Sequence, residues 1–237
     1  MIKTNIVMLV LASRSNKYDK MINNYWSNMI NYINTNKITT IKIFLVFGNN
    51  VETSDLNLSE NDKLITNTPE SIIPGILDKT ISAFTIINNS YNYKHIIRTN
   101  LSSFYILHNL INISNGLEDT NLYSGYNGLY KNSIPFISGA GIWLSRDNVQ
   151  YIIDNQSSLD KQLIDDVAIG KLLINHKKGV LQRHDIINSN IEIQDKVTLL
   201  NNIINNNNFH IRIKSNTKNQ EIDINYMNKF TEILYIQ

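Results

Sequence analysis

The stretch His95-Ile-Ile-Arg-Thr-Asn-Leu-Ser-Ser-Phe104 decides the fold that we expect for this chain. It begins with a short β-type run at 95–97, which predicts a strand that stops at the polar residues 98–100. An apolar pattern with helical spacing starts at Phe104 and predicts a helix after the polar turn. In an open α/β sheet, the turn after the carboxyl end of a strand is where ligands bind.

The polar residues of this turn allow two interpretations. Arg98 offers a fork of donors that suits a phosphate or a carboxylate, and Asn100, Ser102 and Ser103 add amide and hydroxyl groups. The same residues also suit an ordinary helix start, with Ser102 or Asn100 as the cap. The stretch by itself favours the helix start, so the rest of the chain has to decide.

Patterns on both sides of this stretch predict an α/β fold. Apolar runs predict strands at 5–12, 41–47 and 62–66, and amphipathic helices are expected at 17–34 and 71–88. Strands that alternate with helices predict a mixed, mostly parallel central sheet with helices on both faces. We find no internal repeat and no linker, which predicts a single domain over 1–237.

The second half of the chain is richer in Gly and Tyr and less regular. A strand or hairpin is expected at 122–130, with its turn at Gly125-Tyr-Asn-Gly128. Ser145 is expected to cap a helix that continues through 149–153. The remaining expected elements are strands at 180–187 and 209–214 and helices at 165–174, 195–204 and 223–236.

Composition limits the possible partners. The net charge of +2 predicts no general attraction to nucleic acid or to an anionic membrane, and the absence of cysteine excludes disulfides and thiolate metal sites. The first apolar run is too short to span a membrane and lacks a signal-cleavage pattern, so we expect a cytoplasmic protein. The abundance of Asn, Ile and Lys indicates an AT-rich genome; for a large DNA virus, the location would be the host cytoplasm.

Three smaller features have both a structural and a functional interpretation. Ser138-Gly-Ala-Gly141 is a tight turn or a place where the backbone approaches a ligand; a P-loop and a Gly-x-Gly-x-x-Gly motif are both missing. Asp165 and Asp166 would stabilise a helix dipole, or one of them would be a general base. His184 is a structural residue, a metal ligand or a phosphate contact.

Two longer motifs change the balance between these interpretations. Pro135-Phe-Ile-Ser-Gly-Ala-Gly-Ile-Trp-Leu-Ser-Arg146 and Ile164-Asp-Asp-Val-Ala-Ile-Gly170 resemble, in order and spacing, two motifs of the inverting β1,3-glycosyltransferases, the relatives of β1,3-galactosyltransferases and Fringe. The element order of the first half is also similar, and the resemblance covers roughly residues 5–190. It implies a GT-A (Rossmann-like) fold, with a nucleotide-binding half at about 1–115 and an acceptor and catalytic half at about 116–237.

The resemblance also implies an activity and a set of site residues. A sugar would pass from a nucleotide-sugar donor, expected to be a UDP-sugar, to a hydroxyl of a glycan or glycosylated protein with inversion. Asp166 matches the general base, and Asp165 would orient it. The residues expected at the donor are Ser13, Arg14, Arg98, Thr99, Asn100 and Ser102. Those expected at the sugar or acceptor are Ser138, Gly139, Ala140, Gly141 and Trp143, whose indole would stack on a sugar face.

The chain departs from this family at the metal-binding position. The first and third aspartates of the family motif, which hold a divalent ion, are replaced by Asn100 and Ser102. Amide and hydroxyl oxygens bind Mn²⁺ or Mg²⁺ far more weakly than carboxylates do. Three possibilities stay open: a weak metal site at Asn100, Ser102 and His184; a metal-independent enzyme in which Arg98, with Arg14 or His184, stabilises the diphosphate; and a non-catalytic nucleotide- or glycan-binding module on a decayed scaffold. A structural or interaction protein would bind no nucleotide at all.

Overall fold

The first half of the chain alternates strands and helices, as its apolar pattern predicts. The computed structural model describes residues 2–176, 178–186, 193–214 and 220–236. Along the chain, the elements of the first half are β1 (Ile2–Lys3), β2 (Ile6–Leu11), α1 (Asn16–Met21), the π-helical η1 (Ile22–Trp26), α2 (Ser27–Thr35), β3 (Ile41–Phe47), η2 (Glu60–Asp62), β4 (Lys63–Ile65), α3 (Gly75–Ser90), β5 (Tyr91–Asn92), β6 (His95–Asn100), β7 (Ser103–Tyr105) and α4 (Leu107–Ser114).

The second half adds shorter strands and four further α-helices to the part of the chain that the structure describes. They are β8 (Tyr123–Gly125), β9 (Asn127–Tyr130), β10 (Ile134–Ile137), β11 (Gly141–Ser145), α5 (Arg146–Asp154), η3 (Gln156–Ser158), α6 (Asp165–Leu172), β12 (Lys178–Val180), β13 (His184–Ile186), α7 (Ile193–Asn205), β14 (His210–Ile213) and α8 (Gln220–Tyr235). None of the helices in the described ranges combines the length and apolar character needed to cross a bilayer.

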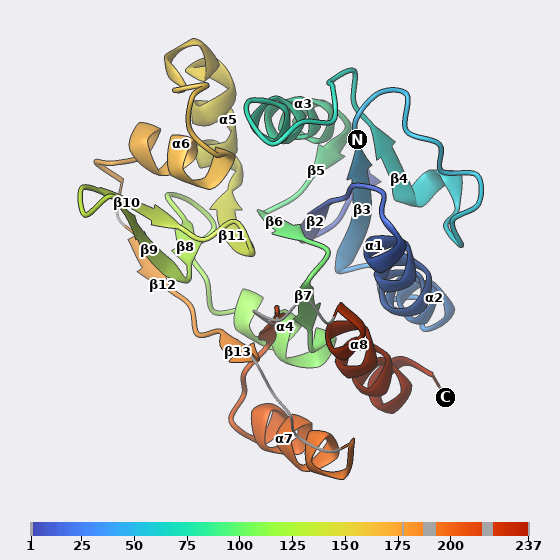
Figure 1. Cartoon of the computed structure of the whole chain (residues 1–237). Coiled ribbons are helices and arrows are strands. Elements are labelled where there is room, and N and C mark those ends of the chain that lie inside the picture. Colours follow the sequence, from blue (N-terminus) through green and yellow to red (C-terminus); the bar gives the residue numbers. More distant parts are fainter. Residues whose placement is uncertain (1, 177, 187–192, 215–219, 237) are drawn as a thin grey trace.

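A seven-stranded sheet in the order β12-β8-β11-β6-β2-β3-β4 forms the centre of the molecule. Strand β11 is antiparallel to both of its neighbours, and the other pairings are parallel. The mixed, mostly parallel sheet is therefore confirmed. Strands from both halves of the chain share this sheet, and β13, β14 and β7 form a separate three-stranded sheet beside it (Figure 1).

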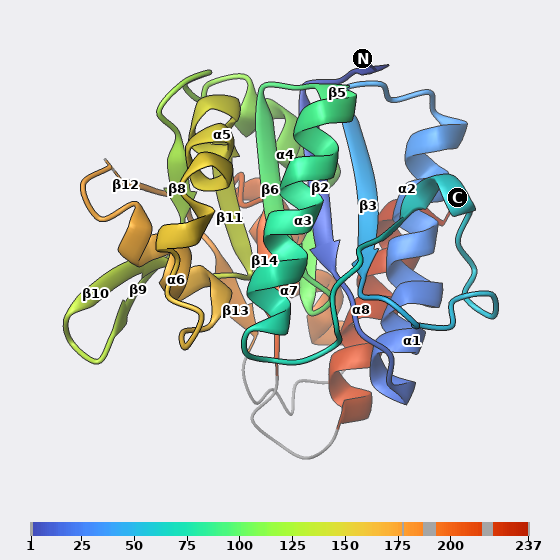
Figure 2. The same cartoon turned by 90° about the horizontal axis from the view of Figure 1, so that it is seen from above.

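Helices cover both faces of the sheet, because the side chains of a buried strand point alternately to opposite sides. Met8 and Val10 of β2 belong to a core that includes residues of α1, α2 and α8, whereas Val7 and Leu9 belong to a core that includes residues of α3 and α5. Figures 1 and 2 show α3 and α5 together on one face and α1, α2 and α8 on the other.

The stretch at 95–104 differs from its prediction in two ways. Strand β6 does not stop before Arg98 but continues to Asn100, because its polar residues pair with β2 on one side and, as far as Thr99, with β11 on the other. The turn is only two residues long, and Phe104 then lies in β7, paired with Ile211 of β14. The helix therefore begins only at Leu107.

Three predictions in the second half also need correction. The hairpin joins β9 to β10, so its turn lies at 131–133, where Lys131 and Asn132 have positive φ, and not at Gly125–Gly128. The strand expected at 180–187 is two strands, β12 and β13, that belong to different sheets, and residue 187 lies outside the described residues. Ser145 occupies the helix-cap position, but its hydroxyl accepts a hydrogen bond from Leu122 N instead.

The strand order places β2 and β6 where a ligand site is expected. The chain moves outward from β2 to β3 and β4, and then returns through α3 to β6 on the other side of β2. At such a reversal of strand order, the connections leave on opposite faces and open a crevice at the carboxyl ends of the two strands.

Candidate functional site

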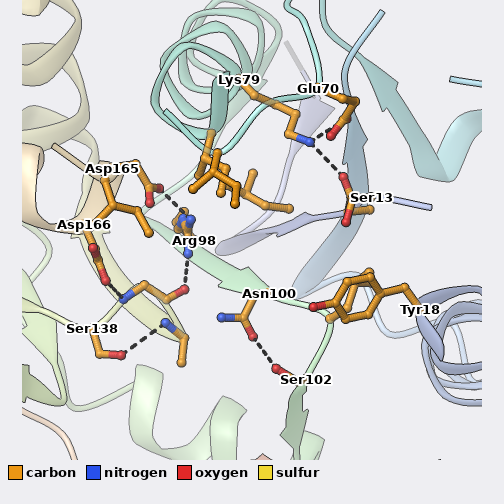
Figure 3. A pocket seen from close by; sticks show the side chains of 18 of the residues that line it. Ser13, Tyr18, Glu70, Lys79, Arg98, Asn100, Ser102, Ser138, Asp165 and Asp166 are labelled. Carbon is orange, nitrogen blue, oxygen red and sulfur yellow. Dashed lines mark hydrogen bonds and ion pairs between the residues drawn. The ribbon is translucent and has the colours of Figure 1, made fainter. Parts of the chain in front are cut away.

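A cavity of about 480 Å³ lies at the carboxyl ends of β2 and β6 (Figure 3). Its walls come from these strand ends, the start of α1, the segment before α3, the turn before β11, the start of α6 and strand β14. The lining residues are Leu11, Ala12, Ser13, Tyr18, Glu70, Ser71, Ile72, Ile76, Lys79, Arg98, Asn100, Leu101, Ser102, Ser138, Gly139, Ala140, Ile164, Asp165, Asp166 and Arg212.

The turn at 138–140 reaches the cavity because β11 is antiparallel to β6. Gly141, the first residue of β11, pairs with Thr99 near the end of β6, so the turn before it lies at the same edge of the sheet. Thr99 and Ser103 donate hydrogen bonds from their hydroxyls to Ala140 O, which fastens this turn to the β6–β7 segment.

A buried ion pair joins β6 to α6 at one wall of the cavity. Arg98 Nη2 lies 2.6 Å from Asp165 Oδ2, and the two side chains are only 5% and 1% exposed. Asp165 Oδ2 also accepts a hydrogen bond from the hydroxyl of Thr80, and Arg98 Nη1 donates to Gly139 O. Both charges are therefore neutralised within the protein, although Arg98 Nε has no hydrogen-bond partner among the described residues.

Asp166 lies beside this pair but is not part of it. Its Oδ2 accepts a hydrogen bond from Gly139 N at 2.8 Å, and its Oδ1 accepts one from Val167 N at 2.9 Å. Burial, and then the neighbouring charge of Asp165, raise the pKa of Asp166 above its usual value of 3.8. A carboxylate with a raised pKa is a better proton acceptor near neutral pH.

Gly139 is needed where Arg98 and Asp166 converge on the turn. A Cβ atom at this position would lie 2.5 Å from Arg98 Nη1 and 3.1 Å from Asp166 Oδ2. The glycine in the predicted Ser138-Gly-Ala-Gly141 element therefore permits close packing of charged side chains against the backbone.

A second ion pair, between buried Lys79 and partly exposed Glu70, forms another wall. Lys79, on α3, lies 2.6 Å from Glu70, and its side chain is 3% exposed. The same ammonium donates to Ala12 O at the end of β2, and Glu70 accepts from Gly48 N at the end of β3. Burial lowers the pKa of Lys79, while Glu70 opposes that shift. This pair links α3 to the ends of β2 and β3, and each of its charges is neutralised by the other.

A third wall contains Asn100, Ser102 and Arg212. Asn100 Oδ1 accepts hydrogen bonds from the hydroxyls of Ser102 and Ser103, each at 3.2 Å, and a further one from Arg212 Nη1. Burial, then the charge of Arg183, lower the pKa of Arg212 to about 10, so it stays protonated at neutral pH.

Four of the six charged side chains that line the cavity form ion pairs with one another. The cavity is lined by Lys79, Arg98 and Arg212 on the positive side and by Glu70, Asp165 and Asp166 on the negative side. Two ion pairs use four of these groups. Within the described ranges, Asp166 and Arg212 have no ion-pair partner. The cavity therefore presents one carboxylate and one guanidinium to a ligand.

Most of the residues predicted to form the site do meet in this cavity. Those that line it are Ser13, Arg98, Asn100, Ser102, Ser138, Gly139, Ala140, Asp165 and Asp166. The start of α6 and the turn before β11 are far apart in the sequence from β2 and β6, so the fold brings together stretches that the sequence could connect only through the resemblance.

Five predicted residues do not line the cavity. Arg14 faces a neighbouring cavity of about 530 Å³, where ion pairs with Asp19 and Asp55, both at 2.7 Å, already neutralise it. Thr99, fully buried, fastens the turn, and Gly141 packs against His210. His184 lies on β13 outside the lining.

Trp143 is the clearest correction among these residues. Its side chain is 1% exposed and packs edge-on against Phe209 in the core. The indole therefore has no free face for the sugar-stacking role that we expected.

Two important residues of the cavity were missed. Lys79 lies among apolar residues of the α3 stripe, and a charged residue in such a stripe is a signal that could have been used. Arg212 alternates with Ile211 and Ile213 in its strand, which predicts that it points away from their core, but nothing in the sequence indicates that it reaches Asn100.

No model of a known protein family matches this chain, and no curated protein matches it. Any function must therefore be argued from the arrangement of these side chains.

Proposed function

We propose that this chain is an inverting glycosyltransferase with a GT-A fold, which transfers a sugar from a nucleotide-sugar donor, with UDP-sugars as the first candidates, to a hydroxyl of a glycan or glycosylated protein. The observation that carries the proposal is the presence of Asp166 and Arg212, neither of which has an ion-pair partner among the described residues, in one cavity at the reversal of strand order. A transferase of this kind needs a proton acceptor and positive charge for a leaving diphosphate.

In the proposed reaction, an acceptor hydroxyl attacks the anomeric carbon of the donor in one displacement. The bond between the acceptor oxygen and the anomeric carbon forms while the bond to the diphosphate oxygen breaks. The hydroxyl proton passes to Asp166, and the departing nucleoside diphosphate keeps the electron pair. The raised pKa of Asp166 supports this role, because it increases the affinity of the carboxylate for that proton.

The surrounding groups hold Asp166 in position. Gly139 N and Val167 N each donate to one of its oxygens, and the Arg98–Asp165 pair fixes the start of α6 against β6. Asp165 is neutralised by Arg98 and also accepts from Thr80, so its proposed role is to orient and to raise the pKa of Asp166, not to take the proton itself.

A non-catalytic nucleotide- or glycan-binding module is the second candidate. It is favoured by Asn100 and Ser102, which lack the carboxylates of the resembled metal motif. The two candidates differ in what happens to a donor when no acceptor is present, since a transferase slowly passes the sugar to water and a binding module does not.

The test is release of the free nucleotide (UDP, GDP or CMP) from a panel of UDP-, GDP- and CMP-sugars, measured without acceptor in EDTA and again with Mn²⁺. We expect release above a protein-free blank, with inverted configuration of the liberated sugar by NMR. Asp166→Asn should lose this release, and Asp160→Asn is its matched control, because Asp160 is paired with Lys171 outside the cavity. Binding without release would support the binding module instead. The absence of both binding and release would contradict both candidates.

A further inference from the structure

The position where the resembled family holds a metal ion is already fully bonded in this chain. Asn100 Oδ1 accepts from Ser102, Ser103 and Arg212. A carbonyl oxygen has two lone pairs, so three donors leave it with none to offer to a metal ion.

The chemistry of this wall also does not fit Mn²⁺ or Mg²⁺. Hard divalent cations need charged oxygen ligands, and the described residues contain no group of three or more His, Cys, Asp or Glu side chains that could hold one. The guanidinium of Arg212 on Asn100 would in addition repel a divalent cation.

Within the described ranges, Arg212 differs from the other cations near the cavity in having no carboxylate as an ion-pair partner. Arg98 is paired with Asp165, Lys79 with Glu70, and Arg14 with Asp19 and Asp55. Arg183, which donates to Ser138, is paired with Asp185 through two hydrogen bonds. Among the described residues, the guanidinium of Arg212 has one hydrogen-bond partner, the neutral amide of Asn100. Asp185 is its neighbour in the β13–β14 register, but that carboxylate is paired with Arg183.

The strand pairing holds Arg212 in this place. Arg212 of β14 lies opposite Ser103 of β7, next to the turn that contains Ser102 and follows Asn100 at the end of β6. The guanidinium of Arg212 is half-buried and has no ion-pair partner among the described residues, so an anion bound in the cavity would stabilise it, since charges removed from water are stable only when paired.

We propose that Arg212 is the resident cation for the diphosphate of the donor, in place of a divalent metal ion. This inference rests on the proposed function for the identity of the ligand. The guanidinium hydrogen-bonds non-bridging phosphate oxygens and stabilises the negative charge that the diphosphate gains as the sugar leaves. The site is then independent of divalent metal, which is the opposite of what the resembled family motif implies.

The experiment is calorimetric titration of UDP, GDP and inorganic pyrophosphate into the whole chain in buffer that contains EDTA. Arg212→Met removes the charge and keeps most of the length, and Arg212→Lys keeps the charge. Lys94→Met is the matched control, because Lys94 pairs with exposed Asp119 at the amino end of β6, away from the cavity. Thermal melting and binding of uridine check that each variant is folded.

We expect wild-type binding to survive EDTA and Arg212→Met to weaken diphosphate and pyrophosphate binding by about 10- to 100-fold. Arg212→Lys should lose less, and Lys94→Met should bind like the wild type. Loss of wild-type binding in EDTA with recovery in Mn²⁺, or unchanged affinity in folded Arg212→Met, overturns the inference and leaves the proposed function standing. Pyrophosphate binding that depends on Arg212, without binding of any nucleotide, supports the cation site and contradicts the transferase.

Discussion

Two walls of the cavity hold their charges in different ways. In the acid wall, formed by Arg98, Gly139, Asp165 and Asp166, a buried ion pair neutralises Arg98 and Asp165, and two backbone N–H groups donate to Asp166. In the amide wall, formed by Asn100, Ser102 and Arg212, a guanidinium rests on a neutral amide. The cation of the acid wall is therefore paired with a carboxylate within the protein, whereas we propose that the cation of the amide wall is paired with an anionic ligand.

The largest expected effect comes from breaking the ion pair of the acid wall. Arg98→Met leaves the carboxylate of Asp165 buried without a cation, and we expect the free energy of unfolding to fall by about 3–5 kcal/mol. Chemical denaturation at neutral pH measures this change in unfolding free energy. In the double variant with Asp165→Asn, much of the loss should be recovered. A double variant as unstable as the sum of the two single variants would show that the pair is not coupled.

The pH dependence of turnover is the second way to test the acid wall. Asp166 accepts a proton only when ionised, and its pKa is raised above 3.8 by burial and by Asp165. The turnover number should fall about tenfold per pH unit below that raised pKa. Since the folded pKa exceeds the unfolded one, the folded state binds the proton more tightly, and the stability contributed by Asp166 declines as pH rises through this window. An acid limb at or below 3.8 would contradict the assignment.

A smaller effect is expected where the backbone of the acid wall is packed most tightly. Gly139→Ala places a methyl group 2.5 Å from Arg98 Nη1, so the pair or the turn must shift, at a cost of about 1–3 kcal/mol in unfolding free energy. Gly116→Ala is the control, because the nearest atom to its added Cβ is 3.6 Å away. Equal stability of the two variants would show that the turn at 138–140 can shift to accept the methyl group without a loss of unfolding free energy.

The smallest effect should follow from Arg14→Met, which sharpens the contrast with Arg212. Arg14 is 25% exposed and paired with two aspartates, so its loss should change stability by only about 0.2–1 kcal/mol. Affinity for UDP should stay the same, since both ion-pair partners of Arg14, Asp19 and Asp55, lie within the protein. A large loss of UDP affinity would mean that Arg14 leaves Asp19 and Asp55 to bind the donor.

The sequence predicts the regular half of the fold because its signals are local. Buried strands such as β2 and β3 appear as uninterrupted apolar runs, and the long helices have clear apolar stripes. The end of β6 was misjudged for the opposite reason. Arg98 and Asn100 have the composition of a turn, but their partners Asp165 and Arg212 come from distant parts of the chain.

The residues of the site also divide into those that a local sequence pattern indicates and those that depend on long-range contacts. The two motifs at 135–146 and 164–170 located the turn before β11 and the start of α6, because each is a continuous pattern. Trp143 lies in the core although it belongs to one of these motifs, because every residue of β11 is buried and its indole packs against Phe209 from a distant part of the chain. Arg212 could not be found, because its role depends on the pairing of β14 with β7, a long-range contact without a local signal.

The most direct test of the central claim is the turnover number of Asp166→Asn at saturating nucleotide-sugar, measured beside the UDP affinity of the same variant. We expect a loss of at least about 100-fold in turnover with nearly unchanged UDP affinity, because the asparagine at 166 cannot take the acceptor proton, whereas Asn100, Ser102 and Arg212 are untouched. Turnover close to that of the wild type would contradict the account.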